Sequence, residues 1–301
     1  MSLYEGLAVE DIQNAADALR PVYVASGRAD GFVSLEVSPY LANDTEGTIA
    51  EAERLWGEVK RPNLMIKVPG TAEGVPAIRE LISDGINVNV TLLFSRRAYE
   101  AVAEAYLAGL EARATRGEPL SSLASVASFF VSRIDTAVDA LLEKRMAAEP
   151  QHAAATQSLL GRTAIANAKL AYETYRSMTG TPRWAKLAAK SARPQRLLWA
   201  STSTKNPRYR DVIYVEQLIG PATVNTLPPA TLEAFREHGA AAQTLEADLQ
   251  GARDLLKAIA DAGVDLDAVT DELLQEGLAQ FVDAFAKLHQ AIEARARTLA
   301  A

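Results

Sequence analysis

The sequence contains no cysteine. Disulfides, thiolate nucleophiles and cysteine-ligated metals are therefore excluded, and the composition fits a reducing compartment such as the cytoplasm. Histidine is scarce, and its three residues lie far apart in the chain: His152, His238 and His289. No two of them share a helical face, so we expect no histidine-rich zinc site and no bound metal.

Long hydrophobic runs and an excess of positive charge are also missing. No stretch approaches the ~20 apolar residues of a membrane span, and no positive cluster precedes an apolar run at the N-terminus. The chain has 31 basic and 38 acidic residues, which gives a formal net charge of -7. We therefore expect no general attraction to nucleic acid or to an anionic membrane, and any anion site must be a local basic pocket.

What is present is the composition of a folded chain. Of the 301 residues, 49% are hydrophobic and 23% are charged, which is typical of globular proteins and not of disordered ones. No linker, low-complexity tract or internal repeat divides the sequence. We expect one domain over residues 1–301, with a helical extension over residues 230–301.

Strand patterns alternate with helical patterns along the chain. Six segments are expected to be strands: Phe32–Ser38, Asn63–Val68, Asn87–Phe94, Ser125–Val131, Arg196–Ser201 and Ala222–Leu227. Helices are expected before the first strand, ending near Pro21, between the strands, and from Thr231 onward. Such an alternation predicts an α/β fold with a parallel sheet, either doubly wound or closed into a barrel.

Polar residues inside the expected strands favour the barrel. Fully buried parallel strands are nearly continuous apolar runs, yet the first and third strands carry polar residues at every second position: Ser34, Glu36, Ser38, Asn87, Asn89 and Thr91. Residues two apart share one face of a strand. Polar side chains of several strands therefore face a common interior, as at the mouth of a TIM-type (β/α)8 barrel. No Gly-rich dinucleotide fingerprint supports the doubly wound sheet.

Lys67 is the residue that most strongly indicates chemistry. It lies among apolar neighbours near the end of the second expected strand, and lysine is rarely buried without a reason. Removal from water would favour the neutral amine, which attacks a carbonyl carbon to form a Schiff base. Glu36, at the matching place one strand earlier, is suited to move protons as the carbinolamine loses water. The alternatives are a structural ion pair between the two, or a phosphate contact of the lysine.

A basic pocket for an anion is expected at the ends of the later strands. Ser128 and Arg133 flank the end of the fourth strand, and the stretch from Ser201 to Lys205 follows the fifth. Arginine grips phosphate with two hydrogen bonds, and lysine adds a point charge. We therefore expect a small phosphorylated substrate.

Some of these residues also have a purely structural interpretation. Asn89 and Thr91 share one strand face, where they could hold substrate hydroxyls or a catalytic water, or could form a satisfied polar layer inside the barrel. Arg133 could be a helix-surface charge paired with Asp135 or Asp139. Spacing alone leaves these alternatives open.

Motifs through nearly the whole chain support one family: VSLEVSP, PNLMIKVPGT, GINVNVTLLFS, SVASFFVSRIDT, LLWASTSTKNP and TVNTLP. Together they resemble the transaldolase family, especially its bacterial branch, some members of which are fused to a phosphoglucose isomerase domain. The resemblance implies that Lys67 is the Schiff-base lysine and that Glu36 is the acid that works through a water. It also implies that Asn89 and Thr91 line the site beside them, with Thr91 in a catalytic role.

The same resemblance implies contacts on the phosphate side of the substrate from Ser128, Arg133, Ser201 and Lys205. The implied reaction moves a dihydroxyacetone unit from a ketose phosphate, such as sedoheptulose 7-phosphate or fructose 6-phosphate, to an aldose phosphate in the pentose phosphate pathway. It needs neither a metal nor an organic cofactor.

One feature of the family is not matched in this sequence. Family members place two further strands before the opening helix, the first with an aspartate that acts as the base in aldol cleavage, and residues 1–28 match neither strand. Because a closed barrel of this type needs eight strands, we expect an incomplete barrel with about six strands, N-terminally truncated relative to the family. Its exposed sheet edges favour a homodimer, and its turnover is expected to be weak.

Two alternative functions follow from the same site. A simple Schiff-base aldolase would release free dihydroxyacetone without an acceptor, and a non-catalytic sugar-phosphate binder would keep the anion pocket without the cleavage base. All three expectations name small sugar phosphates as the partners, in a cytoplasmic protein that binds neither nucleic acid nor membrane.

Overall fold

Six parallel strands form the single sheet found in the structure, a computed structural model that describes residues 3–300. The strands are β1 Val33–Glu36, β2 Leu64–Pro69, β3 Val88–Leu93, β4 Ser125–Phe130, β5 Arg196–Ala200 and β6 Thr223–Asn225. Their order in the sheet is their order along the chain. All six strands expected from the sequence are confirmed, with ends that shift by at most two residues.

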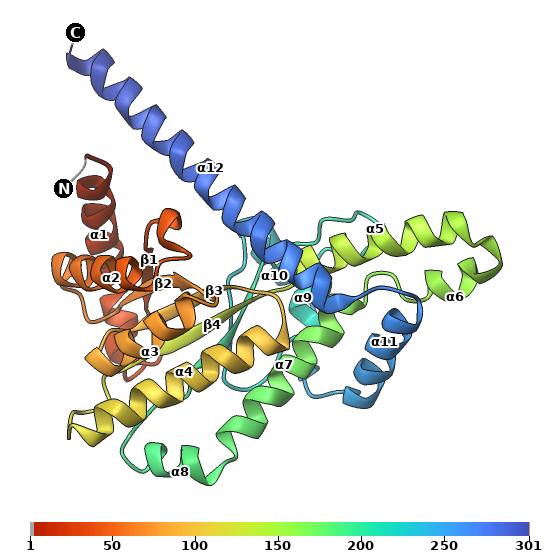
Figure 1. The fold of residues 1–301 in the computed structure, drawn as a ribbon, viewed down its shortest axis with the longest axis horizontal. Helices are drawn as coiled ribbons and strands as arrows, with labels where there is room; N and C mark the ends of the chain where they lie inside the picture. The colour runs from red at the N-terminus through yellow and green to blue at the C-terminus, as the bar shows by residue number, and fades with distance from the viewer. Residues whose placement is uncertain (1–2, 301) are drawn as a thin grey trace.

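Helices follow the strands and pack around the sheet (Figure 1). They are α1 Leu3–Ala25, α2 Thr45–Val59, α3 Gly74–Asp84, α4 Arg96–Thr115, α5 Ser132–Ala148, α6 Ala153–Gln157, α7 Thr163–Thr179, α8 Pro182–Ala188, α9 Ile213–Glu216, α10 Pro229–His238, α11 Leu249–Asp261 and α12 Leu266–Ala300, with 3₁₀ turns at Pro39–Leu41 and Pro150–His152. The alternation confirms an α/β fold of the TIM-barrel type, and the sheet of the described residues is not closed.

Local sequence signals set several of the helix boundaries. The side chain of Asp44 accepts a hydrogen bond from the Gly47 amide at the start of α2, and Ser95 does the same for Ala98 at the start of α4. These caps satisfy amide groups that the first turn of a helix leaves without partners. At the other end, Gly85 terminates α3 with φ +92°, a conformation that glycine adopts without strain.

Four segments differ from the sequence expectation. Helix α1 does not end at Pro21 but continues through it to Ala25. The short helices α8 and α9 have no counterpart in the expected pattern, and residues 239–248 between α10 and α11 are not helical. Proline weakens a helix without always ending it, and helices of four to seven residues are too short for a periodic apolar face to be recognised.

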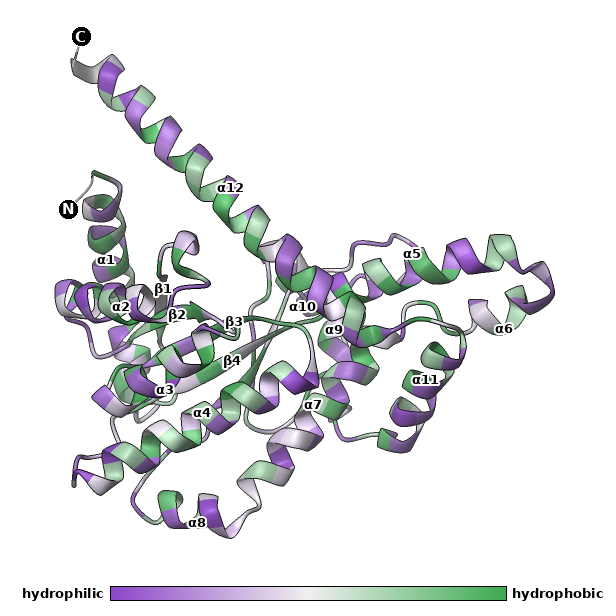
Figure 2. Cartoon of the chain, in the orientation of Figure 1, coloured by the Kyte–Doolittle hydropathy of each residue, from purple (hydrophilic) through white to green (hydrophobic). Residues whose placement is uncertain are grey.

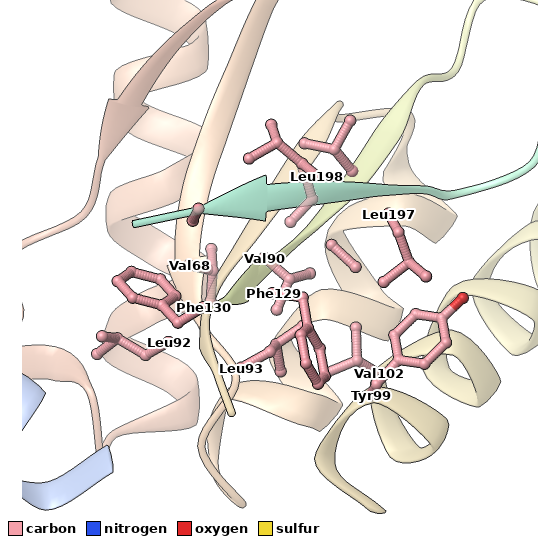
Figure 3. Close-up of a cluster of buried hydrophobic side chains, with 14 of the residues drawn as sticks. Val68, Val90, Leu92, Leu93, Tyr99, Val102, Phe129, Phe130, Leu197 and Leu198 are labelled. Carbon is pink, nitrogen blue, oxygen red and sulfur yellow. The ribbon is translucent and has the colours of Figure 1, made fainter. Parts of the chain in front are cut away.

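The two faces of the sheet serve different purposes. Every second side chain of a strand points outward and packs against the helices. Figure 3 shows this for Phe129 of β4 and Leu197 of β5, which lie near Tyr99 and Val102 of α4. The strands are predominantly apolar in Figure 2, while the covering helices alternate apolar and polar residues. The outward residues form the main hydrophobic core. The inward residues, which include Lys67, remain available for a site.

The two edges of the sheet, β1 and β6, are not hydrogen-bonded to each other. At the amino ends of the strands, the loop before β1 reaches across this gap. Arg193 donates hydrogen bonds to the carbonyl oxygens of Gly27 and Arg28, and Arg196 donates to that of Ala29 and forms an ion pair with Asp30 at 3.2 Å. These contacts hold the two ends of the sheet together where no strand lies between them.

Candidate active site

The inward faces of all six strands line one cavity of about 680 Å³. Its lining includes six of the residues expected from the sequence: Glu36, Lys67, Asn89, Thr91, Ser128 and Ser201. Side chains at alternate positions of a strand point to the same face, which is why residues far apart in the chain meet here. The shared interior predicted from the period-two polar pattern is therefore present, lined by Ser34, Glu36, Asn89 and Thr91 but not by Ser38 and Asn87.

Lys67 and Glu36 form an ion pair inside this cavity. The two residues are direct partners in the register of β1 and β2, and the Lys67 Nζ lies 3.0 Å from the Glu36 Oε2. Their side chains are 24% and 28% exposed, so the amine faces the cavity and is only partly withdrawn from water. The amine is less dry than the sequence predicts, because the Lys67 side chain faces the cavity inside the unclosed sheet.

Asn89 connects three strands through its amide group. Its Nδ2 donates a hydrogen bond of 3.0 Å to the Ser34 hydroxyl on β1, and its Oδ1 accepts one of 2.7 Å from the Ser128 hydroxyl on β4. Asn89 is also the register partner of Lys67. The polar groups beside the amine are thus held in fixed positions, and Asn89 has few hydrogen-bonding sites left for a ligand.

Thr91 differs from its neighbours because its hydroxyl is unused. The residue is fully buried, and its Oγ1 has no hydrogen-bond partner among the described residues. The next residue, Leu92, has φ +60°, and the register of β3 against β4 shifts at this point. A non-glycine residue in this conformation signals local strain, which is common beside functional sites. Thr91 therefore lines the cavity with a buried hydroxyl that has no partner among the described residues.

Two expected residues, Arg133 and Lys205, do not line the cavity. The Arg133 guanidinium donates a hydrogen bond of 2.9 Å to the Gln280 side chain on α12, and the Lys205 Nζ donates one of 2.8 Å to the Ser203 hydroxyl. Both residues follow the carboxyl ends of β4 and β5, so they stand near the mouth of the cavity.

Asp135 and Asp139 are buried on α5 and do not pair with Arg133, so that structural interpretation of Arg133 is wrong. Asp135 accepts hydrogen bonds from the Ala164 amide and from the Tyr214 hydroxyl, at 2.7 and 2.8 Å. Burial raises the pKa of Asp135 to about 6, against the lowering effect of these two hydrogen bonds. The carboxyl therefore titrates in a mildly acidic range.

Sequence reasoning missed two contributors to the site. The ring of Phe281 on α12 lies 5.5 Å from the Lys67 Nζ, and the ion pair of Arg196 with Asp30 lines the amino-terminal end of the cavity. No local signal marks Phe281, because aromatic residues at helical spacing are usually core residues. Arg196 was visible as a charge at the start of the fifth strand but not as part of the cavity.

Lys169 is the lysine whose pKa is lowered by burial. It lies on α7 beside a separate cavity of about 250 Å³, and its Nζ donates a hydrogen bond of 2.9 Å to the Ala247 carbonyl oxygen. Within the described residues, no group of three or more His, Asp and Glu side chains is arranged to hold a metal ion. None of the helices in residues 3–300 combines the length and apolar character needed to cross a bilayer.

The chain is similar to a transaldolase family model and to several proteins named transaldolase. A family model described as "Transaldolase/Fructose-6-phosphate aldolase" matches residues 1–292. A protein of Nostoc punctiforme named "Transaldolase 2" is 49% identical over 302 residues, which cover 99% of this chain and 79% of the relative. Proteins named "Transaldolase" from Frankia alni and Thiobacillus denitrificans are each 50% identical, over 94% and 95% of this chain and 75% and 78% of their own lengths.

Proposed function

We propose, from the premise that the chain belongs to the transaldolase/fructose-6-phosphate aldolase family, that Lys67 and Glu36 carry out its Schiff-base chemistry. The chain is an enzyme, a transferase with transaldolase function that moves a dihydroxyacetone unit from a ketose phosphate to an aldose phosphate. The sequence predicts weak turnover, because residues 1–28 do not match the two N-terminal strands of the family. This prediction gains no support, because a relative named transaldolase aligns with 99% of the chain.

The observation that carries the assignment is the 3.0 Å contact between the Lys67 Nζ and the Glu36 Oε2 inside the cavity. In the proposed cycle, the ammonium gives up a proton to reach the nucleophilic amine, and the amine attacks the ketone carbon of the substrate. Glu36 is close enough to take that proton and to return it, directly or through one water, when the carbinolamine loses its hydroxyl. The iminium then takes up the electron pair of the breaking carbon–carbon bond and becomes an enamine. The hydroxyl on the departing carbon loses its proton to solvent water and becomes the aldehyde of the released aldose phosphate.

Thr91 and Asn89 are proposed to position the reacting groups beside the amine. The buried, unpartnered Thr91 hydroxyl supports a bond to the catalytic water or to a substrate hydroxyl. Asn89 is tied to Ser34 and Ser128, which supports a role in holding this polar wall in place. Fixed dipoles of this kind need no reorganisation during reaction.

The phosphate side of the substrate is proposed to lie toward Ser128, Arg133, Ser201 and Lys205. Two observations support this direction. Helix α5 starts directly after β4, so its positive N-terminal end faces the mouth of the cavity, and the Ser132 and Ser201 hydroxyls meet there at 2.9 Å. Arg133 and Lys205 are long side chains at the same rim, and their present partners are neutral groups that a phosphate would replace.

The wider setting proposed for this activity is the pentose phosphate pathway in the cytoplasm, in one barrel domain over residues 1–301. The sugar-phosphate reaction supports the pathway, and the cysteine-free composition supports the reducing compartment. We also propose a homodimer, because β1 and β6 leave two sheet edges without strand partners among the described residues.

A comparison of two glutamine variants tests the pair. Glu36→Gln keeps the shape of the side chain but removes its charge and its ability to exchange protons, so kcat for transfer from fructose 6-phosphate to erythrose 4-phosphate should fall by about 100-fold or more. Glu53→Gln, an exposed change on α2, should leave kcat unchanged. Equal rates for Glu36→Gln and the unmodified enzyme would refute the proposed role of Glu36.

A further inference from the structure

Helix α12 runs across the carboxyl ends of β1 to β4, where its residues meet Tyr40, Lys67, Leu92 and Arg133. Gly277 lies against the irregular stretch of β3, where a Cβ on this residue would come within 2.9 Å of the Leu92 Cδ2. One turn later Gln280 accepts the hydrogen bond from Arg133, and Phe281 lies over Lys67. The absence of a side chain at Gly277 thus permits the close approach that brings Phe281 to the amine.

The Lys67 amine is held between a carboxylate and an aromatic ring. Glu36 lies 3.0 Å from the Nζ, and the centroid of the Phe281 ring lies 5.5 Å from the same atom. This distance is within the range of a cation–π contact, in which the ring face attracts a positive charge. A protonated Schiff base on Lys67 carries its positive charge at this same nitrogen, so the ring is placed to favour it.

Phe281 also has an anchored position. It is partly buried against the main core, next to Leu278, which is 8% exposed. The following turn of the helix carries Phe285, whose ring contacts Tyr4 and Tyr40 at 5.2 and 5.9 Å. Phe285 also lines a second cavity together with Glu36, so it is not independent of the site, whereas Leu288 on the next turn of α12 is 44% exposed.

We propose that Phe281 is a positioning residue that covers the Schiff base on Lys67 and keeps water away from it, so that the intermediate waits for the acceptor aldehyde. This inference rests on the proposed function of Lys67. A transferase passes the Lys67-bound intermediate to an acceptor, whereas an aldolase releases it by hydrolysis. Phe281, which lies outside the six strands, would favour the first outcome.

The chemistry of the intermediate shows why water exclusion matters. After carbon–carbon cleavage, Lys67 carries an enamine, whose carbon attacks the acceptor aldehyde to form the new bond, while the aldehyde oxygen takes up a proton. In the competing path the enamine carbon is protonated, a water oxygen adds to the iminium carbon, and the carbon–nitrogen bond then breaks to release dihydroxyacetone and the free amine. Only the second path consumes water, so a ring that excludes water slows it selectively.

The test is the ratio of two initial rates with fructose 6-phosphate as the donor. One rate is the release of free dihydroxyacetone without an acceptor, and the other is transfer to erythrose 4-phosphate. In Phe281→Ala the ratio of release to transfer should rise about tenfold. Phe281→Leu retains apolar volume and should give a smaller rise, and it allows the ratio to be measured if the alanine variant does not fold. Leu288→Ala, an exposed apolar change on the same helix, is the control and should leave the ratio unchanged.

Borohydride trapping of the donor on Lys67 separates the two proposals. If the unmodified enzyme and the Phe281 variants all yield the Lys67 adduct, and the rate ratio rises only in the Phe281 variants, the inference is supported. If the adduct forms but the ratio stays within twofold of the unmodified enzyme, or rises equally in Leu288→Ala, the inference is overturned while the proposed function stands. If the folded, unmodified enzyme yields no adduct, the proposed function fails and the inference fails with it.

Discussion

The Thr91 hydroxyl makes no hydrogen bond within residues 3–300 that would stabilise the fold. It is fully buried, and leaving such a group unsatisfied costs about 1–3 kcal/mol. Thr48 offers a contrast, because its equally buried hydroxyl donates a hydrogen bond of 2.9 Å to the Leu41 carbonyl oxygen. The proposed role of Thr91 accounts for this difference, since a bound ligand or water would satisfy its hydroxyl.

Replacing each threonine by valine should therefore separate stability from activity. Thr91→Val should leave the free energy of unfolding unchanged or slightly raised, while kcat for transfer falls by about 10-fold or more, because the hydroxyl serves the reaction alone. Thr48→Val should lose about 1 kcal/mol of stability at unchanged kcat. Urea unfolding and steady-state rates measure the two quantities. Full activity in Thr91→Val would contradict the assigned role.

Asp135 is a buried acid that the proposed reaction does not use. Its folded-state pKa of about 6 lies above the ordinary value of 3.8 because of burial, so folding favours the protonated form. The stability that this group contributes is fully present below about pH 4 and is lost as the pH rises through 6. The carboxyl therefore makes the folded state less stable at neutral pH than at mildly acidic pH.

Asp135→Asn should remove that pH dependence. The amide cannot ionise, so the stability of the variant relative to the unmodified protein should increase between pH 4 and pH 7, by up to about 3 kcal/mol for a shift of about two pKa units. Asp283→Asn, an exposed change on α12, should show no such trend. Denaturant unfolding at several pH values measures the difference, and a constant difference across this range would argue against a raised pKa at Asp135.

At the scale of elements, α1 shows how a helix tolerates a residue that usually ends it. Pro21 is exposed inside α1 and has no amide hydrogen to donate to the preceding turn. Pro229 is equally exposed, but it lies in the first turn of α10, where an amide hydrogen would have no helical partner. The same residue type thus weakens one helix and suits the other.

Alanine substitutions at the two prolines should therefore have different effects. Pro21→Ala restores a hydrogen bond within α1 and should raise the free energy of unfolding by about 1 kcal/mol or more. Pro229→Ala should change it by less than about 0.5 kcal/mol. Chemical denaturation of both variants gives the comparison. A loss of stability in Pro21→Ala would mean that α1 depends on the bend at this residue.

The sequence predicts those parts of the site that follow from strand periodicity. Glu36, Lys67, Asn89 and Thr91 meet in one cavity because side chains at alternate positions share a face. The register that places Glu36 beside Lys67 follows from strand pairing, which the alternation of βα units already indicates. Strand existence and the inward face were therefore within reach of sequence reasoning.

The rest depends on contacts that no local pattern reveals. Phe281 reaches Lys67 only because α12 folds back across the mouth of the cavity, and its own sequence surroundings are those of an ordinary amphipathic helix. Arg133 is directed toward Gln280 on that same helix rather than into the cavity. The packing of α12 thus determines both the position of Phe281 and the direction of the Arg133 side chain. This long-range packing cannot be predicted from the local pattern of a single sequence.

At the scale of the whole molecule, the gap between β1 and β6 is spanned by arginine contacts instead of strand pairing. The Arg193 guanidinium donates to the carbonyl oxygens of Gly27 and Arg28, which lie just before β1. These bonds join the segment before β5 to the segment before β1, so they connect elements near opposite edges of the sheet. Charged donors of this kind are stronger than neutral ones.

Arg193→Ala should loosen this connection without unfolding the molecule. We expect faster amide hydrogen exchange in residues 26–32 and a loss of about 1 kcal/mol in the free energy of unfolding. Arg253→Ala, which removes a surface ion pair with Glu173 between α11 and α7, should leave exchange in residues 26–32 unchanged. Unaltered exchange there in Arg193→Ala would show that the loop is held by other contacts.

The most direct measurement for the whole account is peptide mapping of the lysine that borohydride fixes to fructose 6-phosphate. Burial lowers the pKa of Lys169, so reactivity governed by that property alone would place the sugar there. The account predicts instead a single adduct on Lys67, beside Glu36, with the Lys169 peptide unmodified. An adduct on Lys169, or none on any lysine of the folded protein, would contradict it.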